Sequence, residues 1–244
     1  MSASGRSDRL RRPLLDGAAQ LGLALPPRMT AFGKHFELLL RHNPRAGLTT
    51  ITDPVEVAVK HFLDSLSGLL ARDIQAGERV ADVGSGGGFP GAVLAVARPE
   101  ARYTLIESNR RRVAFLRELL PALGLANAEV VAARAEQIGR DTAHRERYDL
   151  VVSRAVAPLR VLLEYCLPLA RVGGQALAYK GPEAEDEIAG SAAALEALGG
   201  RVQGLRHLRL PQDMGERILV LVEKTTPTPG RYPRRSGIPA KRPL

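Results

Sequence analysis

The sequence contains no tryptophan and a single cysteine, and aromatic residues make up only 4% of its 244 residues. Proteins that bind single-stranded nucleic acid without sequence preference stack bases on aromatic side chains, so this composition argues against such a platform. Cys166 has no partner for an internal disulfide, and its apolar neighbours Leu163 and Leu167 are typical of a helix interior. We therefore interpret Cys166 as a packing residue.

Long apolar runs are also absent. No stretch approaches the ~20 apolar residues that span a bilayer, and the N-terminus lacks an apolar segment of the signal-peptide type. We therefore expect a cytoplasmic protein that does not bind membranes. Hydrophobic residues still make up 45% of the chain, which is enough for one sizeable core.

The most informative stretch is residues 80–91, where a short apolar strand runs into a turn with five glycines in eight residues. Glycine readily adopts positive φ and allows a ligand to approach backbone N–H groups. The alternative is an ordinary strand-to-helix turn, which the average glycine content near 7% makes the less favoured interpretation. We expect Asp82, Gly84 and Gly86 to belong to a cofactor site.

The spacing of these residues bears on which cofactor binds. A dinucleotide frame exists at Gly86, Gly88 and Gly91, but Pro90 then falls where the phosphate-binding helix should already have begun. Asp82 instead places a carboxylate just before the glycines. This spacing resembles the motif of class I methyltransferases that use S-adenosylmethionine, whose cationic sulfonium favours a nearby carboxylate.

Glu107 supplies a second signal, because it ends the next expected strand 23 residues after Gly84. A ribose-binding acid is expected about 20 residues after such a turn. The alternative is a solvated acid at the start of the following helix. Together with the glycine turn, the spacing favours ribose binding.

Strand and helix patterns alternate along the rest of the chain. Strands are expected at 79–83, 103–107, 128–132, 149–153, 175–180, 201–208 and 217–223, with helices at 90–98, 109–123, 158–170 and 183–198. This alternation predicts a parallel sheet flanked by helices. Residues 210–215 are too few for a crossover helix, so the last two strands should form an antiparallel hairpin. The predicted fold class is α/β, a Rossmann-like seven-stranded, mostly parallel sheet of the class I methyltransferase type.

Basic residues follow the carboxyl ends of these strands. Because ligands of open α/β sheets bind at that edge, we expect Arg134, Arg154, Lys180 and Arg217 to converge on one rim. Each alone is more readily a solvated surface cation, but together they suit phosphate and base contacts.

A helical cap is expected before the sheet, over residues 28–75. One helix should cover 29–42 and end at Asn43-Pro44, and another should begin after the N-cap Asp53 with Glu56 reaching back to it. His61 and Asp64 then share one helix face. Either this face closes over the substrate or it forms a hydrogen-bond cluster between cap and sheet. One His and one Asp are too few to predict a metal site.

Positive charge is concentrated at the C-terminal end of the sequence. The net charge is +9, and the last 21 residues contribute six basic residues, five prolines and no acid. Such a segment predicts an extended arm over 225–244, in which Arg234 and Arg235 bind nucleic-acid phosphates with strong salt dependence. A solubilising tail is the alternative. Residues 1–27 are Arg-rich at their start and are expected to be disordered.

Several motifs together resemble the bacterial 16S ribosomal RNA guanine-N7 methyltransferase family, also called glucose-inhibited division protein B. They are KHFLDSL at 60–66, DVGSGGGFPG at 82–91, RAE at 134–136, SRA at 153–155, KG at 180–181, GER at 215–217 and RYPRRSGIP at 231–239. The resemblance covers residues 28–244. It departs at residues 47–50, where the family usually has Asn-Leu-Thr-Ser and this chain has Gly-Leu-Thr-Thr.

The resemblance implies a set of site residues. Gly84, Phe89, Ala135, Glu136 and Arg154 would contact S-adenosylmethionine, whereas Arg134, Lys180 and Arg217 would face the RNA. The implied substrate is a guanine in the decoding region of 16S rRNA, presented by the 30S subunit or its precursor. Residues 76–224 would form the methyltransferase domain of a monomer without an obligate protein partner.

The implied chemistry needs little from the enzyme, because guanine N7 carries a lone pair and no proton. Neither His61 nor Asp64 is then required as a base, and Asp64 is expected to stabilise charge that develops on the guanine. Two alternatives are a methyltransferase acting on a small molecule or a protein, and a non-catalytic RNA-binding protein. The former predicts activity without RNA, and the latter predicts no cofactor affinity.

Overall fold

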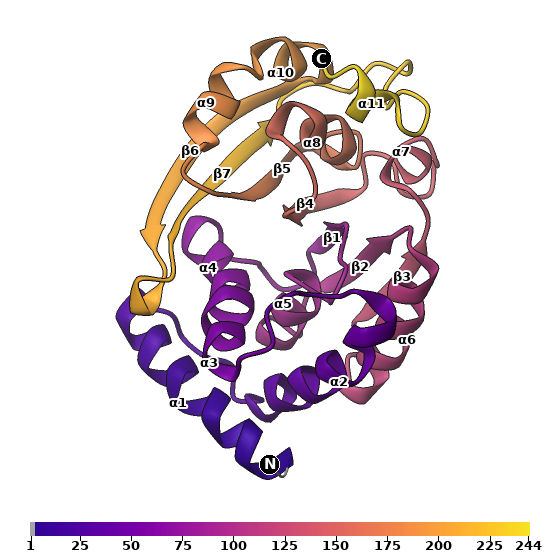
Figure 1. The fold of residues 1–244 in the computed structure, drawn as a ribbon. Coiled ribbons are helices and arrows are strands. Elements are labelled where there is room, and N and C mark those ends of the chain that lie inside the picture. The colour runs from indigo at the N-terminus through magenta and orange to yellow at the C-terminus, as the bar shows by residue number, and fades with distance from the viewer. Residues whose placement is uncertain (1–2) are drawn as a thin grey trace.

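The computed structural model describes residues 3–244 and contains one seven-stranded sheet (Figure 1). The strands are β1 (Arg79–Val83), β2 (Arg102–Glu107), β3 (Ala128–Ala132), β4 (Tyr148–Arg154), β5 (Ala170–Lys180), β6 (Gly200–Arg209) and β7 (Glu216–Lys224). Their order is β3-β2-β1-β4-β5-β7-β6, with β1 to β5 parallel and β7 antiparallel to both of its neighbours. The predicted fold class, including the closing hairpin, is confirmed.

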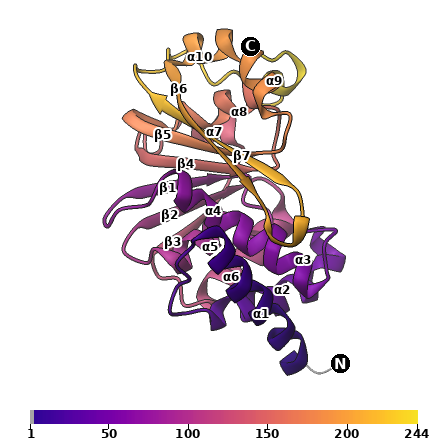
Figure 2. The same cartoon turned by 90° about the vertical axis from the view of Figure 1, so that its left-hand side faces the viewer.

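Helices cover both faces of the sheet (Figures 1 and 2). On one face lie α1 (Ala3–Leu21), α2 (Thr30–Ala46), α3 (Pro54–Val57), the π-helical η1 (Ala58–Leu63), α4 (Asp64–Ala71), α5 (Gly91–Ala97) and α6 (Arg110–Ala122). On the other lie α7 (Ala135–Ile138), α8 (Leu159–Cys166), α9 (Ala184–Ala189), α10 (Ala192–Leu198) and α11 (Ile238–Lys241). A short 3₁₀ turn, η2 (Pro211–Asp213), joins β6 to β7. No helix in residues 3–244 combines the length and apolar composition that a bilayer crossing requires.

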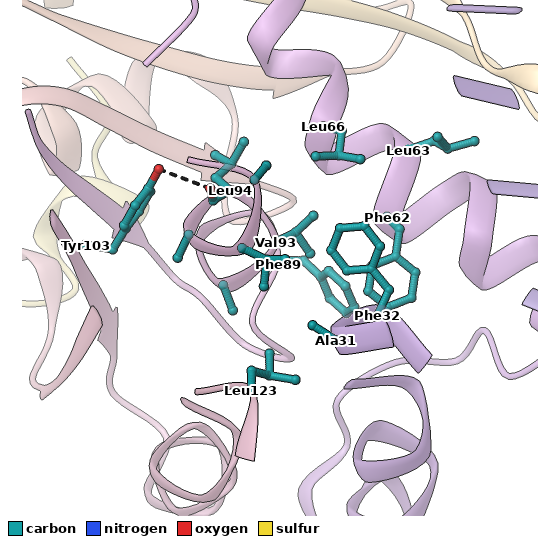
Figure 3. Close-up of a cluster of buried hydrophobic side chains, with 14 of the residues drawn as sticks. Ala31, Phe32, Phe62, Leu63, Leu66, Phe89, Val93, Leu94, Tyr103 and Leu123 are labelled. Carbon is teal, nitrogen blue, oxygen red and sulfur yellow. Dashed lines mark hydrogen bonds between the residues drawn. The ribbon is translucent and has the colours of Figure 1, made fainter. Parts of the chain in front are cut away.

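The helices before β1 share one core with the sheet. Figure 3 shows Phe32 of α2 and Phe62 of η1 beside Phe89, which follows the glycine turn. The ring centroids of Phe32 and Phe62 are 4.9 Å apart, and those of Phe62 and Phe89 are 5.5 Å apart. Aromatic pairs at these separations add stability beyond their buried area, so the cap is fixed on the turn that forms the candidate cofactor site.

Several predicted helix boundaries differ from the structure. Helix α2 continues through Pro44 to Ala46 and ends where Gly47 adopts the left-handed conformation, with φ 58°. Asp53 caps α3 as expected by accepting two backbone N–H bonds, but Glu56 pairs with Lys60 and does not reach back. The helix expected at 183–198 is two helices, α9 and α10, interrupted between residues 189 and 192.

The prediction of a disordered N-terminus is wrong for residues 3–21, which form α1; residues 1–2 lie outside the described residues. Leu10, Leu14 and Ala18 recur every four residues and are buried. They pack toward η1, and Gly17 lies against Pro211 of η2. The four-residue spacing was present in the sequence, but the Arg-rich composition around it favoured disorder.

The prediction of an extended arm at 225–244 is also wrong. The segment packs on α7 and α8, with Tyr232 and Pro239 buried. Just before it, Lys224 is fully buried, and its ammonium donates to the carbonyl oxygens of Leu167 at 2.9 Å and Leu198 at 3.2 Å. Sequence reasoning could not foresee these contacts because the tail's partners lie far away in the chain.

Leu14 and Leu15 provide a matched test of α1. Leu14 is 1% exposed and Leu15 is 39% exposed. Leu14→Ala should lower the free energy of unfolding by roughly 2–5 kcal/mol, since it removes buried methyl groups and leaves a cavity. Leu15→Ala should change it by less than about 0.5 kcal/mol. Urea unfolding followed by circular dichroism measures both, and equal values would mean that α1 does not pack in solution.

Candidate functional site

The turn after β1 contains glycines at which other groups lie close to the backbone. Gly84 has φ 78°, and a side chain at this position would also overlap Val156, from the segment after β4. Gly91, at the start of α5, donates its N–H to Asp82 Oδ2 at 2.9 Å, and a Cβ there would lie 2.6 Å from the same oxygen. Burial raises the pKa of Asp82 to about 7, and its Oδ1 has no hydrogen-bond partner among the described residues. The positive φ of Gly84 and the short distance from Gly91 to Asp82 therefore require glycine at positions 84 and 91.

Glu107 lies across from this turn at the end of β2. Its Oε2 accepts the N–H of Gly86 at 3.0 Å, and its Oε1 accepts those of Ser108 at 2.7 Å and Asn109 at 2.8 Å. A carboxylate offers about four acceptor sites, so capacity remains for a hydroxyl donor. The three backbone bonds fix the carboxylate at the mouth of the turn.

A cavity of about 280 Å³, which we call the glycine-turn pocket, opens beside these groups. Its lining includes Gly84, Ile106, Glu107, Ser108, Arg134, Ala135, Glu136, Val156, Tyr165, Gly237 and Ala240. The volume is near the lower end of the range for small-molecule sites, roughly 300–1,000 Å³. Apolar walls, one aromatic ring, an acceptor with spare capacity and side-chain-free backbone suit a nucleoside-sized ligand.

A second cavity of about 510 Å³, the arginine pocket, adjoins the first through Val156 and Ala157, which line both. Its charged lining residues are Lys60, Asp64, Arg154, Lys180, Glu187 and Arg217. Cations therefore outnumber acids by four to two. Three of the four cations predicted to converge on one rim, Arg154, Lys180 and Arg217, meet in this pocket, whereas Arg134 lines the glycine-turn pocket.

The Asp64 carboxylate binds two arginines of the arginine pocket. Its side chain is 1% exposed. Oδ2 accepts Arg154 Nη1 at 2.8 Å, and Oδ1 accepts Arg217 Nε at 2.9 Å. Arg154 Nη1 also donates to the carbonyl of Lys60 at 2.9 Å. One carboxylate thus joins the cap, the end of β4 and the start of β7.

His61 lies in η1, within the same pocket. Its Nε2 is 2.8 Å from Thr49 Oγ1, and its ring stacks on Phe89 with centroids 4.7 Å apart. His35 stacks on the other side of Phe89 at 4.6 Å, and its Nε2–H donates to the carbonyl of Gly87 at 2.7 Å. Burial, and then the nearby Arg154 charge, lower the pKa of His61 to about 3, while burial lowers the pKa of His35 to about 4.

The predicted site residues thus divide into distinct groups. Of those expected to hold the cofactor, Gly84, Glu107, Ala135 and Glu136 line the glycine-turn pocket. Asp82 and Gly86 support the turn, Phe89 lies within the histidine stack, and Arg154 lines the arginine pocket. Of the two tail arginines, Arg234 pairs with the buried Glu164 and Arg235 is exposed. Within residues 3–244, no group of three His, Cys, Asp or Glu side chains could hold a metal ion.

Sequence reasoning missed Val156, Tyr165, Gly237 and Ala240 as pocket residues. None has a side chain with distinctive chemistry in this setting, and no spacing rule links the tail to the first strand. It also treated His61 and Asp64 as either pocket residues or members of a cap-to-sheet cluster. In the structure both side chains line the arginine pocket and also make hydrogen bonds between elements.

Similarity to known proteins shows the family of this chain. The family model GidB, described as rRNA small subunit methyltransferase G, matches residues 28–214. The chain belongs to this family. It is 52% identical to the Ribosomal RNA small subunit methyltransferase G of Symbiobacterium thermophilum over 95% of this chain and 96% of that protein, and 46% identical to the one of Pelotomaculum thermopropionicum over 96% and 99%.

Solved structures agree on the fold of this GidB family member. The crystal structure of a putative methyltransferase from Bacillus halodurans C-125 is 16% identical and aligns with a TM-score of 0.53, covering 67% of this chain and all of that chain. The family resemblance stated from sequence motifs is therefore confirmed, and so is the methyltransferase fold.

The two depressed histidine pKa values yield a prediction about pH. Between pH 7 and 5 the rings of His35 and His61 should remain neutral. Because unfolded histidine titrates near 6.5, the unfolded chain gains protons below that pH that the native state does not bind. The contribution of these two histidines to the free energy of unfolding should therefore fall as the pH drops from 6.5 toward 4, and Asp82, whose raised pKa lets the native state bind a proton in this range, should offset part of that loss. Nitrogen-15 NMR of the rings checks the protonation directly, and a midpoint near 6.5 for either ring would contradict the buried stack.

Proposed function

We propose that this protein is an S-adenosylmethionine-dependent methyltransferase that modifies N7 of a guanine in small-subunit ribosomal RNA. The single observation that carries the proposal is the adjacency of the two pockets, one suited to a nucleoside and one lined by cations. Membership of the rRNA small subunit methyltransferase G family supports the substrate class. The substrate implies action in the cytoplasm, where bacterial ribosomes assemble.

The glycine-turn pocket would hold the methyl donor. When bound, S-adenosylmethionine supplies an electrophilic methyl group on a sulfonium centre. Glu107 would accept the ribose hydroxyls, and Gly84 would leave backbone open to the ligand. Ala135 and Glu136 at the start of α7 line the same pocket and would contact the base. Asp82 would support the turn by accepting the N–H of Gly91.

The proposed reaction requires no proton transfer by the protein at the atom that is methylated. Guanine N7 carries a lone pair and no hydrogen, so a general base has no role. His61, with its pKa near 3, is neutral at physiological pH and makes no acid or base contribution. Positioning is then the main source of rate acceleration, and the stack of His35, Phe89 and His61 would hold the His61 ring in place in the lining of the arginine pocket.

The arginine pocket would receive the RNA. Lys180 is held by Glu187 at 2.6 Å, whereas Arg217 is 25% exposed at its side chain. Arginine and lysine suit phosphate oxygens and the O6 and N7 acceptors of guanine. In A-form RNA the N7 edge faces a deep, narrow groove, so the target should be an unpaired or splayed guanine. Arg134, at the neighbouring pocket, would extend the basic surface.

Asp64 would act as a positioning residue. Both of its oxygens bind arginines and its side chain is only 1% exposed, so the carboxylate faces the guanidinium groups and not the open part of the pocket. We therefore revise its expected role: it would hold Arg154 and Arg217 at the rim and set how much positive charge the RNA meets.

Asp64→Asn tests this role. Removing one charge from a buried, hydrogen-bonded cluster perturbs both arginines, so kcat/KM for RNA should fall at least tenfold. Affinity for S-adenosylhomocysteine should change less than threefold, since Asp64 does not line the glycine-turn pocket. Asp213→Asn, which alters an acid with 84% side-chain exposure, is the control. Unchanged turnover of folded Asp64→Asn would remove the positioning role.

The activity itself is tested by transfer of labelled methyl from S-adenosylmethionine to 30S subunits that lack the modification. The label should appear on a guanine that becomes sensitive to cleavage chemistry specific for 7-methylguanosine. Naked 16S rRNA and assembly intermediates, run in parallel, identify the preferred substrate. Label on an adenine, on protein or on a small molecule without RNA would overturn the assignment. Absence of any heat with S-adenosylhomocysteine would favour a non-catalytic RNA-binding protein.

A further inference from the structure

The last part of the chain reaches the candidate cofactor site. Gly237 and Ala240 line the glycine-turn pocket together with Gly84 and Glu107, although more than 100 residues separate them in sequence. We infer that residues 228–244, the C-terminal segment, form one wall of the cofactor site and that an ion pair between Glu164 and Arg234 holds this wall in place. The inference rests on the proposed function, because it takes an S-adenosyl nucleoside as the ligand.

The ion pair anchors the segment to α8. Glu164 of α8 is completely buried. It accepts the backbone N–H of Arg234 at 2.7 Å, Nε of the same residue at 2.9 Å and Nη2 at 2.5 Å. A buried carboxylate that loses its partner is strongly destabilised, so Glu164 holds Arg234, and with it the chain on either side, against α8.

Two further arginines clamp the approach to this point through backbone oxygens. Arg145 donates to the carbonyls of Thr228 at 2.6 Å and Tyr232 at 2.8 Å. Arg140 donates to the carbonyl of Pro233 at 2.7 Å. Charge-assisted hydrogen bonds of this kind are short and strong, so the chain reaches Arg234 along a fixed path.

Beyond Arg234 the segment contacts the pocket directly. Gly237, with φ 82°, donates its N–H to Glu136 Oε1 at 2.8 Å, and Glu136 is itself a pocket residue. Helix α11 then begins at Ile238 and places Ala240 on the pocket wall. The segment therefore fixes Glu136 and closes the side of the pocket that lies toward α7.

A calorimetric titration with S-adenosylhomocysteine, without RNA, tests the anchor. Arg234→Ala should weaken binding at least tenfold, because the wall is released from Glu164. Arg242→Ala is the matched control: it removes the same charge from an exposed position of the same segment, and its affinity should stay within twofold of the parent protein. Equal affinities for all three proteins, with intact thermal unfolding, would overturn the inference.

Thiol labelling at position 240 tests the same inference without breaking the Glu164–Arg234 ion pair. Cys166 is the only cysteine and is buried, so Ala240→Cys introduces the single accessible thiol. Its reaction with a maleimide should slow at least fivefold when S-adenosylhomocysteine is saturating. Ser236→Cys, exposed and outside the pocket lining, should react at the same rate with and without the nucleoside. Equal rates at position 240 would show that the segment does not border the ligand.

The two measurements separate the inference from the proposed function. If the parent protein binds the nucleoside while Arg234→Ala binds equally well and position 240 is unprotected, the wall is disproved and the enzyme assignment stands. If the parent protein binds no S-adenosyl nucleoside, the proposed function fails and the inference fails with it. A tenfold loss with Arg234→Ala together with protection at position 240 supports both.

Discussion

The buried carboxylate of Asp64 is the interaction on which the arrangement of the site depends. It binds Arg154, which ends β4, and Arg217, which begins β7, from a helix that precedes the whole sheet. Because β7 runs antiparallel to β5, its start lies at the same edge as the ends of the parallel strands. Without a shared anion, two guanidinium groups at this edge would repel each other. The cap is therefore an electrostatic requirement for the cationic rim.

The same cap supports the glycine turn by packing. Phe62 and His61 are neighbours in the π-helical η1, and both contact Phe89. π-helical turns often mark functional sites, and here the widened turn places an aromatic residue and a histidine against one ring. The guanidinium of Arg154, which lines the arginine pocket, lies over the ring of Phe89 at 5.2 Å from its centroid, so this ring connects the glycine turn to the cationic pocket.

Most of the sheet could be predicted from sequence because strands such as β1, β2 and β4 are short, largely apolar and followed by a helix or a turn signal. The Asp82 and Gly84 spacing and Glu107 at the next strand end predicted the edge at which the glycine-turn pocket opens, since both are local patterns with a fixed physical reason. The insertion of β7 between β5 and β6 was not accessible, because pairing partners of a hairpin strand depend on the whole sheet. The resemblance to known motifs supplied the substrate class, which residue spacing alone does not contain.

The two ends of the chain show why composition misleads. The N-terminal segment has Leu10, Leu14 and Ala18 on one helix face, but this weak pattern competes with many charges. The tail has the composition of a free basic arm, yet its anchoring acid, Glu164, lies 70 residues earlier, inside an apolar helix. Nothing in the sequence around Glu164 distinguishes it from a surface acid. Such pairs become visible only when the fold brings them together.

The clamps on the C-terminal segment bind main-chain oxygens and not side chains. Arg145 and Arg140 contact the carbonyls of residues 228, 232 and 233, groups that every amino acid possesses. These arginine contacts therefore do not depend on which side chains stand at the three positions, although the side chains of Thr228, Tyr232 and Arg234 make further contacts of their own. Substitution can alter the outer charge of the segment while its course over the protein is preserved, so the basic surface and the geometry of the pocket wall can evolve separately.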